Sequence, residues 1–194
     1  MNKYRWHLDI IPEDEAHQDI AKGFRRQLPQ CLQRQVSILP PQGGYDGAFA
    51  KAEEKGRREC KTKIQLVLVD FDGGLAPSGE SAIDDQYIVA RVNRAKEVCD
   101  KDVSGQTFVL GPFQEAENLC GELGPQTSRF SRRDVRDVNS KVKIGMLFAS
   151  GDMVCDESLW QCGQLAHSYN QEQMKKLCAL LRRKLVAECK GAHV

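Results

Sequence analysis

The sequence lacks several features that mark specialised classes of protein. No apolar run approaches the roughly 18 residues that a membrane-spanning helix needs. The 28 basic and 27 acidic side chains leave a net charge of +1, so no broad basic field attracts nucleic acid to the whole surface. Only 7 prolines and a hydrophobic content of 41% exclude a disordered chain. The composition indicates a globular protein with one sizeable core, in which any nucleic-acid contact must come from a local basic group.

Targeting signals and paired cysteines are also missing. The first residues contain no apolar stretch of the length found in secretory signals, so we expect a cytoplasmic protein without membrane contact. No two of the 8 cysteines are separated by two residues, as they would be in a zinc knuckle or a redox motif. We therefore expect free thiols.

Apolar residues follow strand-like and helix-like spacings in turn along the first two thirds of the chain. The expected strands are residues 6–11, 35–39, 64–69 and 107–110, and the expected helices are residues 16–28, 45–60, 84–98 and 115–123. The third strand is almost continuously apolar, which is typical of a central parallel strand covered on both faces. Four strand-and-helix units predict an α/β fold with a parallel sheet of about four strands and flanking helices.

The remaining third of the chain is expected to be a helical C-terminal extension. Asn170 is a candidate N-cap for the last helix, with Gln173 three residues later and an apolar face over residues 174–185. We find no convincing linker. The predicted organisation is an α/β domain over residues 1–125 and a helical extension over residues 126–194, packed on the same domain.

Acidic residues follow two of the expected strands. Residues 13–15 come after the first strand, and Asp70 and Asp72 come after the third. Ligands of parallel α/β sheets bind beyond the carboxyl ends of the strands, and converging carboxylates repel each other unless a cation neutralises them. We predict a site for Mg²⁺ or Mn²⁺ with Glu13, Asp70 and Asp72 as ligands and catalytic residues. Because Mg²⁺ commonly completes its shell with substrate phosphate, the expected substrate is a phosphoester.

These acidic positions and the order of the elements resemble the Toprim domain, the catalytic domain shared by topoisomerases, bacterial primases and OLD-family nucleases. The resemblance covers about residues 5–125, and the family's glutamate and Asp-x-Asp fall on Glu13, Asp70 and Asp72. It implies a Toprim-like sheet and metal-dependent cleavage of nucleic-acid phosphodiesters, with Glu13 also serving as a general base or water-positioning group. One departure is Asp14, which stands where the family often has glycine.

A narrower resemblance connects the chain to small standalone Toprim-like proteins of bacterial defence islands. It rests on residues 67–72, residues 108–111, Trp160 and residues 167–170. It implies a role in antiviral defence with DNA or RNA as one partner. A separate ATPase subunit is the second expected partner, because this chain has no P-loop, and a homodimer is left open.

Two other functions fit the same residues. Residues 68–73 also resemble the first motif of haloacid-dehalogenase-type phosphatases, in which Asp70 would be the nucleophile and Asp72 the acid or base. Against that reading, Gly74 stands where those enzymes have threonine, and two strand-and-helix units precede the motif. The second alternative is a catalytically inactive Toprim-like interaction subunit, which the departure at Asp14 favours.

Basic and imidazole side chains supply further candidates. The densest basic group could contact nucleic-acid phosphates or form a solvated helix face. It consists of Arg129, Arg132, Arg133 and Arg136. His7 and His17 flank the first acidic group, and we interpret them as structural or solvated.

Overall fold

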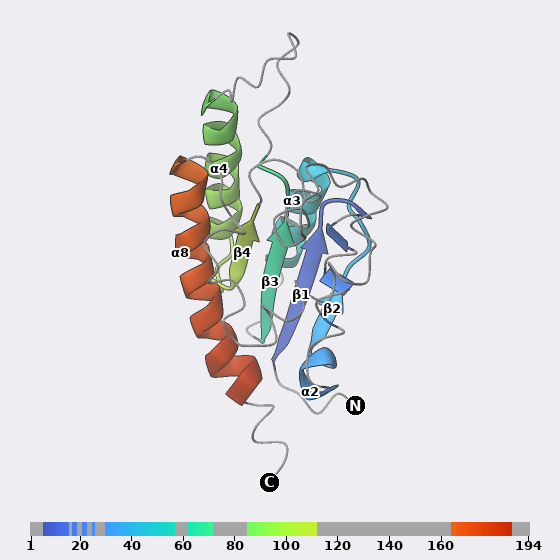
Figure 1. The fold of residues 1–194 in the computed structure, drawn as a ribbon. Coiled ribbons are helices and arrows are strands. Elements are labelled where there is room, and N and C mark those ends of the chain that lie inside the picture. Colours follow the sequence, from blue (N-terminus) through green and yellow to red (C-terminus); the bar gives the residue numbers. More distant parts are fainter. Residues whose placement is uncertain are drawn as a thin grey trace, which may run out of the picture.

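The structure is a computed structural model of the 194-residue chain. It describes residues 6–15, 17–18, 21–22, 25, 30–56, 62–71, 85–111 and 164–187. Four strands form one sheet in the order β2-β1-β3-β4, and every pair of neighbours is parallel (Figure 1). The strands are β1 (His7–Pro12), β2 (Val36–Ile38), β3 (Lys63–Leu68) and β4 (Thr107–Leu110). The predicted parallel α/β sheet is confirmed.

The described helices flank this sheet. They are α2 (Gln30–Gln33), α3 (Tyr45–Gly56), α4 (Asp85–Asp100), α8 (Gln164–Leu181) and the π-helical turn η2 (Arg182–Val186) that continues α8. The helices expected over residues 45–60 and 84–98 correspond to α3 and α4, whereas the one expected over residues 115–123 lies outside the described residues. The assignment of Asn170 as an N-cap is wrong, because α8 begins at Gln164.

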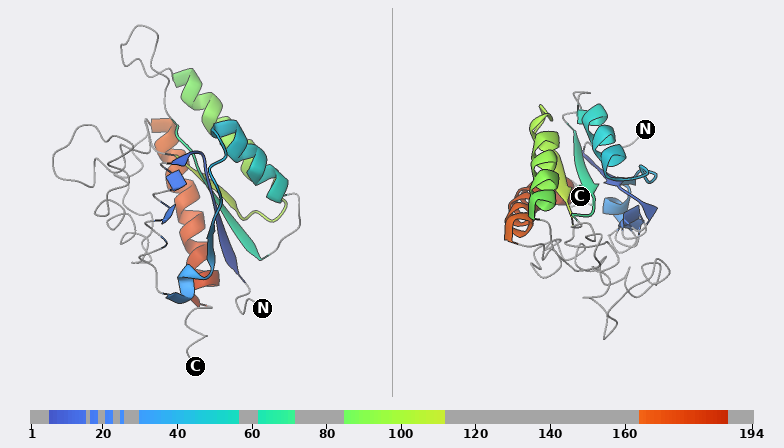
Figure 2. Two further views of the ribbon diagram at one scale, coloured as in Figure 1. Left: turned by 90° about the vertical axis from the view of Figure 1, so that its right-hand side faces the viewer. Right: turned by 90° about the horizontal axis from the view of Figure 1, so that it is seen from above.

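Both faces of the sheet are buried, which explains the nearly continuous apolar run of β3. Side chains alternate along a strand, so Leu66 of β3 packs in one core with Leu177 of α8, while Val67 packs in a second core with Val92 of α4. Figure 2 shows the resulting three layers, with α3 and α4 on one side of the sheet and α8 on the other. The C-terminal helix is therefore a layer of the α/β core.

The chain leaves the neighbouring strands β1 and β3 toward opposite faces of the sheet. After β1 it enters a helical stretch in which Ala21 joins the core on the α8 side. After β3 it continues to α4, whose Ile88 and Val92 join the core on the other side. Open α/β sheets bind their ligands at such a divergence, beyond the carboxyl ends of the two strands, and we call this position the crevice. The fold thus places residues just after β1 and β3 at the favoured position for a site.

Among the described cysteines, Cys31 departs from the sequence expectation of free thiols. Cys99 and Cys178 form no disulfide, whereas Cys31 is disulfide-bonded. Burial raises the pKa of the Cys99 thiol to about 11, so this cysteine is a poor nucleophile.

The buried side chain of Asn170 joins helix α8 to the carboxyl edge of the sheet. Asn170 donates a hydrogen bond to the Gly111 carbonyl at 2.6 Å and accepts one from the Gly111 N–H at 3.3 Å. Gly111 passes so close to β3 that an added Cβ would lie 2.6 Å from the Val69 carbonyl oxygen. Beside this contact, Tyr169 packs edge-to-face against Phe71 with ring centroids 5.9 Å apart.

Replacing Asn170 with alanine should destabilise the protein by about 2–4 kcal/mol, because both backbone groups of Gly111 lose their partner in a buried place. Urea unfolding of N170A and of the parent measures this difference. K175A, on the exposed face of the same helix, is the control and should change stability by less than about 0.5 kcal/mol. Equal stability of N170A and K175A would contradict this role for Asn170.

Candidate metal centre

Pairing of β1 with β3 brings Glu13 and Asp70 together. Pro12 lies opposite Leu68, and the Glu13 N–H donates to the Leu68 carbonyl at 2.9 Å, which extends the pairing by one residue. Two residues further along, the Asp70 N–H donates to Glu13 Oε2 at 2.9 Å. The carboxylate of Glu13 is thereby turned across the crevice toward the end of β3.

A glycine turn fixes the backbone of Glu13. The N–H groups of Gln42 and Gly44 each donate to the Glu13 carbonyl at 3.2 Å. Gly43 and Gly44 have φ values of 79° and 128°, a region that favours glycine. Because these amides are engaged by Glu13, the turn serves to hold the acidic residue in place.

Asp14 begins the helical stretch after β1 and holds His17. Its Oδ1 accepts a hydrogen bond at 3.0 Å from the backbone N–H of His17, which lies three residues later. This is the bond by which an N-cap side chain begins a helix. The same oxygen lies 2.8 Å from His17 Nδ1, so the imidazole is bonded through one of its nitrogens. The ring of His17 is buried, with 2% of the residue exposed.

The second nitrogen of His17 faces the acidic residues. Nε2 lies 3.2 Å from Asp70 Oδ1, and neither atom makes a hydrogen bond within the described part of the chain. One ligand atom from each of Glu13, His17 and Asp70 lies within 4.8 Å of the others. This group of two carboxylates and one imidazole could hold a metal ion.

Burial and charge govern the protonation of the group. Burial raises the pKa of Glu13, although the hydrogen bond from the Asp70 N–H and the charge of His17 oppose the shift. Burial by itself would lower the pKa of His17, but the hydrogen bond to Asp14 and the nearby Asp70 carboxylate outweigh it and raise the value to about 10. Without a metal, His17 therefore supplies the cation that separates these carboxylates.

Arg91 of α4 adds a second cation at this edge. Its Nη1 donates to the backbone carbonyl of Asp70, and its guanidinium lies over the ring of Tyr45, 4.6 Å from the centroid. The Tyr45 hydroxyl in turn donates to the Arg91 carbonyl at 3.0 Å. The arginine is thus held beside Asp70, where it favours the ionised form of Glu13.

The structure brings together only part of the set that the sequence predicted. Glu13 and Asp70 meet as expected, while Asp72 lies outside the described residues, as do Arg129, Arg132, Arg133 and Arg136. His17, which was interpreted as structural or solvated, is buried, and its two ring nitrogens lie 2.8 Å from Asp14 and 3.2 Å from Asp70. The sequence feature that could have indicated this place is an aspartate three residues before His17, at the start of a helix. A histidine at that position of the first helical turn is directed back toward the end of the strand.

Comparison with known protein families, curated proteins and solved structures found no match for this chain. Within the described ranges, no helix combines the length and apolar character needed to cross a membrane. The site is therefore judged from its own geometry.

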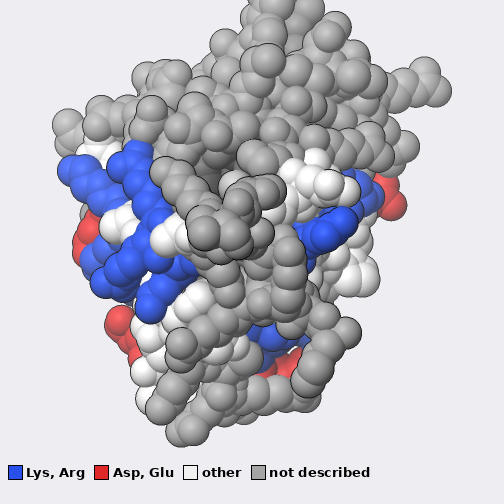
Figure 3. Space-filling view, turned by 90° about the horizontal axis from the view of Figure 1, so that it is seen from below, with Lys and Arg blue, Asp and Glu red and all other residues white. Residues whose placement is uncertain are grey.

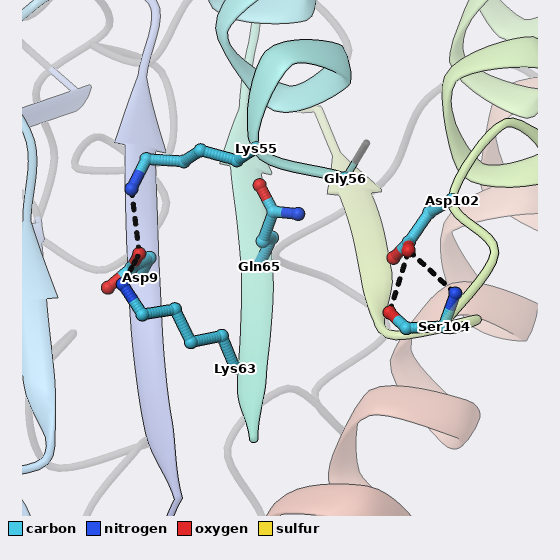
Figure 4. Close-up of a pocket in the computed structure, with 7 residues that line it drawn as sticks. All are labelled: Asp9, Lys55, Gly56, Lys63, Gln65, Asp102 and Ser104. Atoms are coloured by element: carbon cyan, nitrogen blue, oxygen red, sulfur yellow. Dashed lines mark hydrogen bonds and ion pairs between the residues drawn. The ribbon is translucent and has the colours of Figure 1, made fainter. Parts of the chain in front are cut away.

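A small pocket lies at the amino ends of the strands, away from the carboxylate group (Figure 4). It contains the buried carboxylate of Asp9, which is paired with Lys55 at 2.9 Å and with Lys63 at 3.4 Å. On its other side, Asp102 accepts hydrogen bonds from Ser104. Because its two lysines and two aspartates carry equal and opposite charge, the pocket has no unbalanced charge that would select a ligand.

Asp102 shapes the loop between α4 and β4. Its carboxylate accepts hydrogen bonds from the N–H and hydroxyl of Ser104, the Gln106 N–H and the Thr107 hydroxyl, at 2.6–3.1 Å. Burial raises the pKa of Asp102, but these hydrogen bonds to the ionised form outweigh it and lower the value overall. The carboxylate therefore stabilises the folded state where it is ionised.

The Asp102→Asn variant should lose about 2 kcal/mol of stability at pH 7, because an amide cannot accept all of these donors. Because the pKa of Asp102 is lowered in the folded state, its ionised carboxylate stabilises the protein fully above the unfolded-state pKa of about 4. This contribution is lost as the pH falls through the folded-state pKa. The difference between parent and variant should thus shrink in acid, as measured by urea unfolding at pH 7 and at about pH 2.5. The exposed Asp100→Asn is the control, and a pH-independent difference would contradict the argument.

Proposed function

We propose that this protein is a metal-dependent phosphodiesterase that acts on nucleic acid, with a Toprim-like arrangement of Glu13 and Asp70. The observation that carries the proposal is the convergence of these two carboxylates with an imidazole at the topological switch point between β1 and β3. The unbonded and buried Nε2 and Oδ1 atoms of His17 and Asp70 are the kind of donor pair that a divalent cation joins.

The residues of the crevice have distinct tasks in this proposal. A bound divalent ion would stabilise the negative charge that develops on a phosphodiester during attack by water. Glu13 is oriented by the Asp70 N–H and, with its raised pKa, is suited to position that water or to accept its proton. Arg91 provides positive charge beside Asp70, which favours the approach of a phosphate group. Asp72 remains a predicted ligand.

The nucleic-acid contacts remain a prediction from the sequence. Seen from the side of the strands' amino ends, Lys and Arg gather toward the side of α8 and η2 (Figure 3). The exposed Arg182 and Arg183 lie on η2. This surface is at the opposite end of the strands from Glu13 and Asp70, so it does not itself direct a substrate into the crevice. The group from Arg129 to Arg136 remains our proposed contact.

The second candidate is a catalytically inactive Toprim-like subunit that binds an ATPase partner. One observation favours it, because a protonated His17 between Asp14 and Asp70 balances the carboxylates without any metal ion. In that case the crevice would be a stable structural feature. Metal binding separates the two candidates.

Removing the charge of either carboxylate should abolish metal-dependent cleavage and weaken Mn²⁺ binding about tenfold or more. The variants E13Q and D70N keep the size of the side chains, and the exposed D46N on α3 is the matched control. Calorimetry measures Mn²⁺ affinity, circular dichroism checks the fold, and labelled DNA and RNA report cleavage. Unchanged Mn²⁺ binding by the double variant E13Q/D70N would contradict the proposal.

The same proteins distinguish the competing functions. Turnover of p-nitrophenyl phosphate with trapping of a phosphoaspartate mimic on Asp70 would favour the phosphatase. Metal-independent binding of an ATPase subunit without cleavage of DNA or RNA would favour the inactive interaction subunit. Neither result is expected of a nuclease that uses Glu13 and Asp70 as metal ligands.

Replacing Arg132 and Arg133 with alanine should weaken binding to DNA or RNA whatever its sequence. Each lost phosphate contact should lower the slope of log affinity against log salt by about one unit. Fluorescence anisotropy at several salt concentrations measures this slope, and Mn²⁺ binding should stay the same. Equal affinity of variant and parent at every salt concentration would show that these arginines form a solvated face.

A further inference from the structure

We propose that His17 is a protein ligand of the metal centre together with Glu13 and Asp70, positioned by Asp14, and that the centre consequently prefers Mn²⁺ to Mg²⁺. The inference rests on the metal site of the proposed function and specifies both its ligand set and its ion. It does not depend on whether the bound ion supports cleavage.

The position of the imidazole carries the first step. When Nδ1–H donates to Asp14, the neutral ring directs the lone pair of Nε2 away from Asp14 and into the crevice. The nearest partner is Asp70 Oδ1 at 3.2 Å, another electron-rich atom, and no hydrogen bond of the described residues satisfies either one. Two such atoms repel each other unless a proton on Nε2 or a metal ion lies between them. Glu13 places a carboxylate oxygen within 4.8 Å of one ligand atom of each of these two residues, which completes three sides of a ligand set.

The bond to Asp14 is the second step. Metal-binding histidines commonly donate their other ring N–H to a carboxylate, which fixes the tautomer and strengthens the nitrogen as a ligand. Asp14 has this relation to His17, at 2.8 Å, and its bond to the His17 backbone N–H holds the two residues in one helical turn. The buried imidazole therefore has little freedom to turn away from the crevice.

The ligand set determines the preferred ion. Mg²⁺ takes oxygen ligands and gives up its water reluctantly, whereas first-row transition ions accept imidazole nitrogen together with carboxylates. Two carboxylates and one imidazole from Glu13, Asp70 and His17 therefore favour Mn²⁺.

The experiment uses the full chain labelled with ¹⁵N and loaded with Mn²⁺. Pulsed EPR detects the coupling between the ion and a directly bound imidazole nitrogen, and we expect this coupling in the parent and its loss in H17Q. Calorimetry should give Mn²⁺ an affinity about tenfold or more above that of Mg²⁺. H17Q should lower Mn²⁺ affinity about tenfold and change Mg²⁺ affinity less than about threefold.

One further variant tests the contact of His17 with Asp14, and another serves as its control. D14N keeps a good N-cap, so the helix start is preserved, but it removes the charge behind the imidazole and should weaken Mn²⁺ binding about tenfold. H7Q is the matched control, because His7 begins β1 at the end opposite the crevice, and it should leave Mn²⁺ affinity unchanged. The parent's nitrogen coupling tests the ligand even if H17Q fails to fold.

The outcomes separate this inference from the proposed function. Mn²⁺ binding that needs Glu13 and Asp70 but shows no nitrogen coupling in the parent would overturn the inference and leave the proposed function intact. Equal affinity for Mn²⁺ and Mg²⁺ would overturn the ion preference. Absence of any binding of Mn²⁺ or Mg²⁺ would overturn both, and would support the interaction subunit in which His17 stays protonated.

Discussion

The parallel pairing of β1 with β3 is the constraint on which the rest of this structure depends. It runs in continuous register from His7 opposite Lys63 to Pro12 opposite Leu68. Side chains alternate between the two faces of a sheet, so a slip of the register by one residue would move every side chain of a strand to the other face. At the amino end this register sets Lys63 beside Asp9, and at the carboxyl end it sets Asp70 beside Glu13. One pairing therefore determines both the ion-paired pocket and the candidate metal centre.

The carboxyl edge is supported from the α8 side as well. Asn170 binds both backbone groups of Gly111 directly after β4, and Tyr169 packs against Phe71, the neighbour of Asp70 in the sequence. The contacts are buried and include aromatic packing and two hydrogen bonds, so they resist displacement of the strand ends. A site built on strand ends needs this support, since its ligand atoms must keep their spacing to within a fraction of an ångström.

The sequence predicted the periodic parts of the structure well and the local exceptions poorly. Apolar alternation and one nearly continuous apolar run identified the four strands of the described sheet, and strand ends in a parallel sheet predicted the meeting of Glu13 and Asp70. Asn170 was misassigned because an asparagine before an apolar helical face has the chemistry of an N-cap, while here the same amide bonds Gly111, a residue distant in sequence. His17 was missed because its role depends on where the helix after β1 begins, which Asp14 decides through a bond that leaves no periodic pattern.

Asp14 connects this local detail to the chemistry of the crevice. An aspartate at that position caps the helix with the same oxygen that holds the imidazole, so the start of the helix and the direction of His17 are set together. Glu13 and Asp70 would repel each other if the crevice held no positive charge, and burial strengthens that repulsion. Either a proton on His17 or a metal ion bound by His17 relieves it in the same place. Because Asp14 holds the imidazole in the same position in both states, exchange of the proton for a metal ion requires little rearrangement of the ligands. The free energy needed to order the ligand side chains is therefore supplied when the chain folds, before any ion binds.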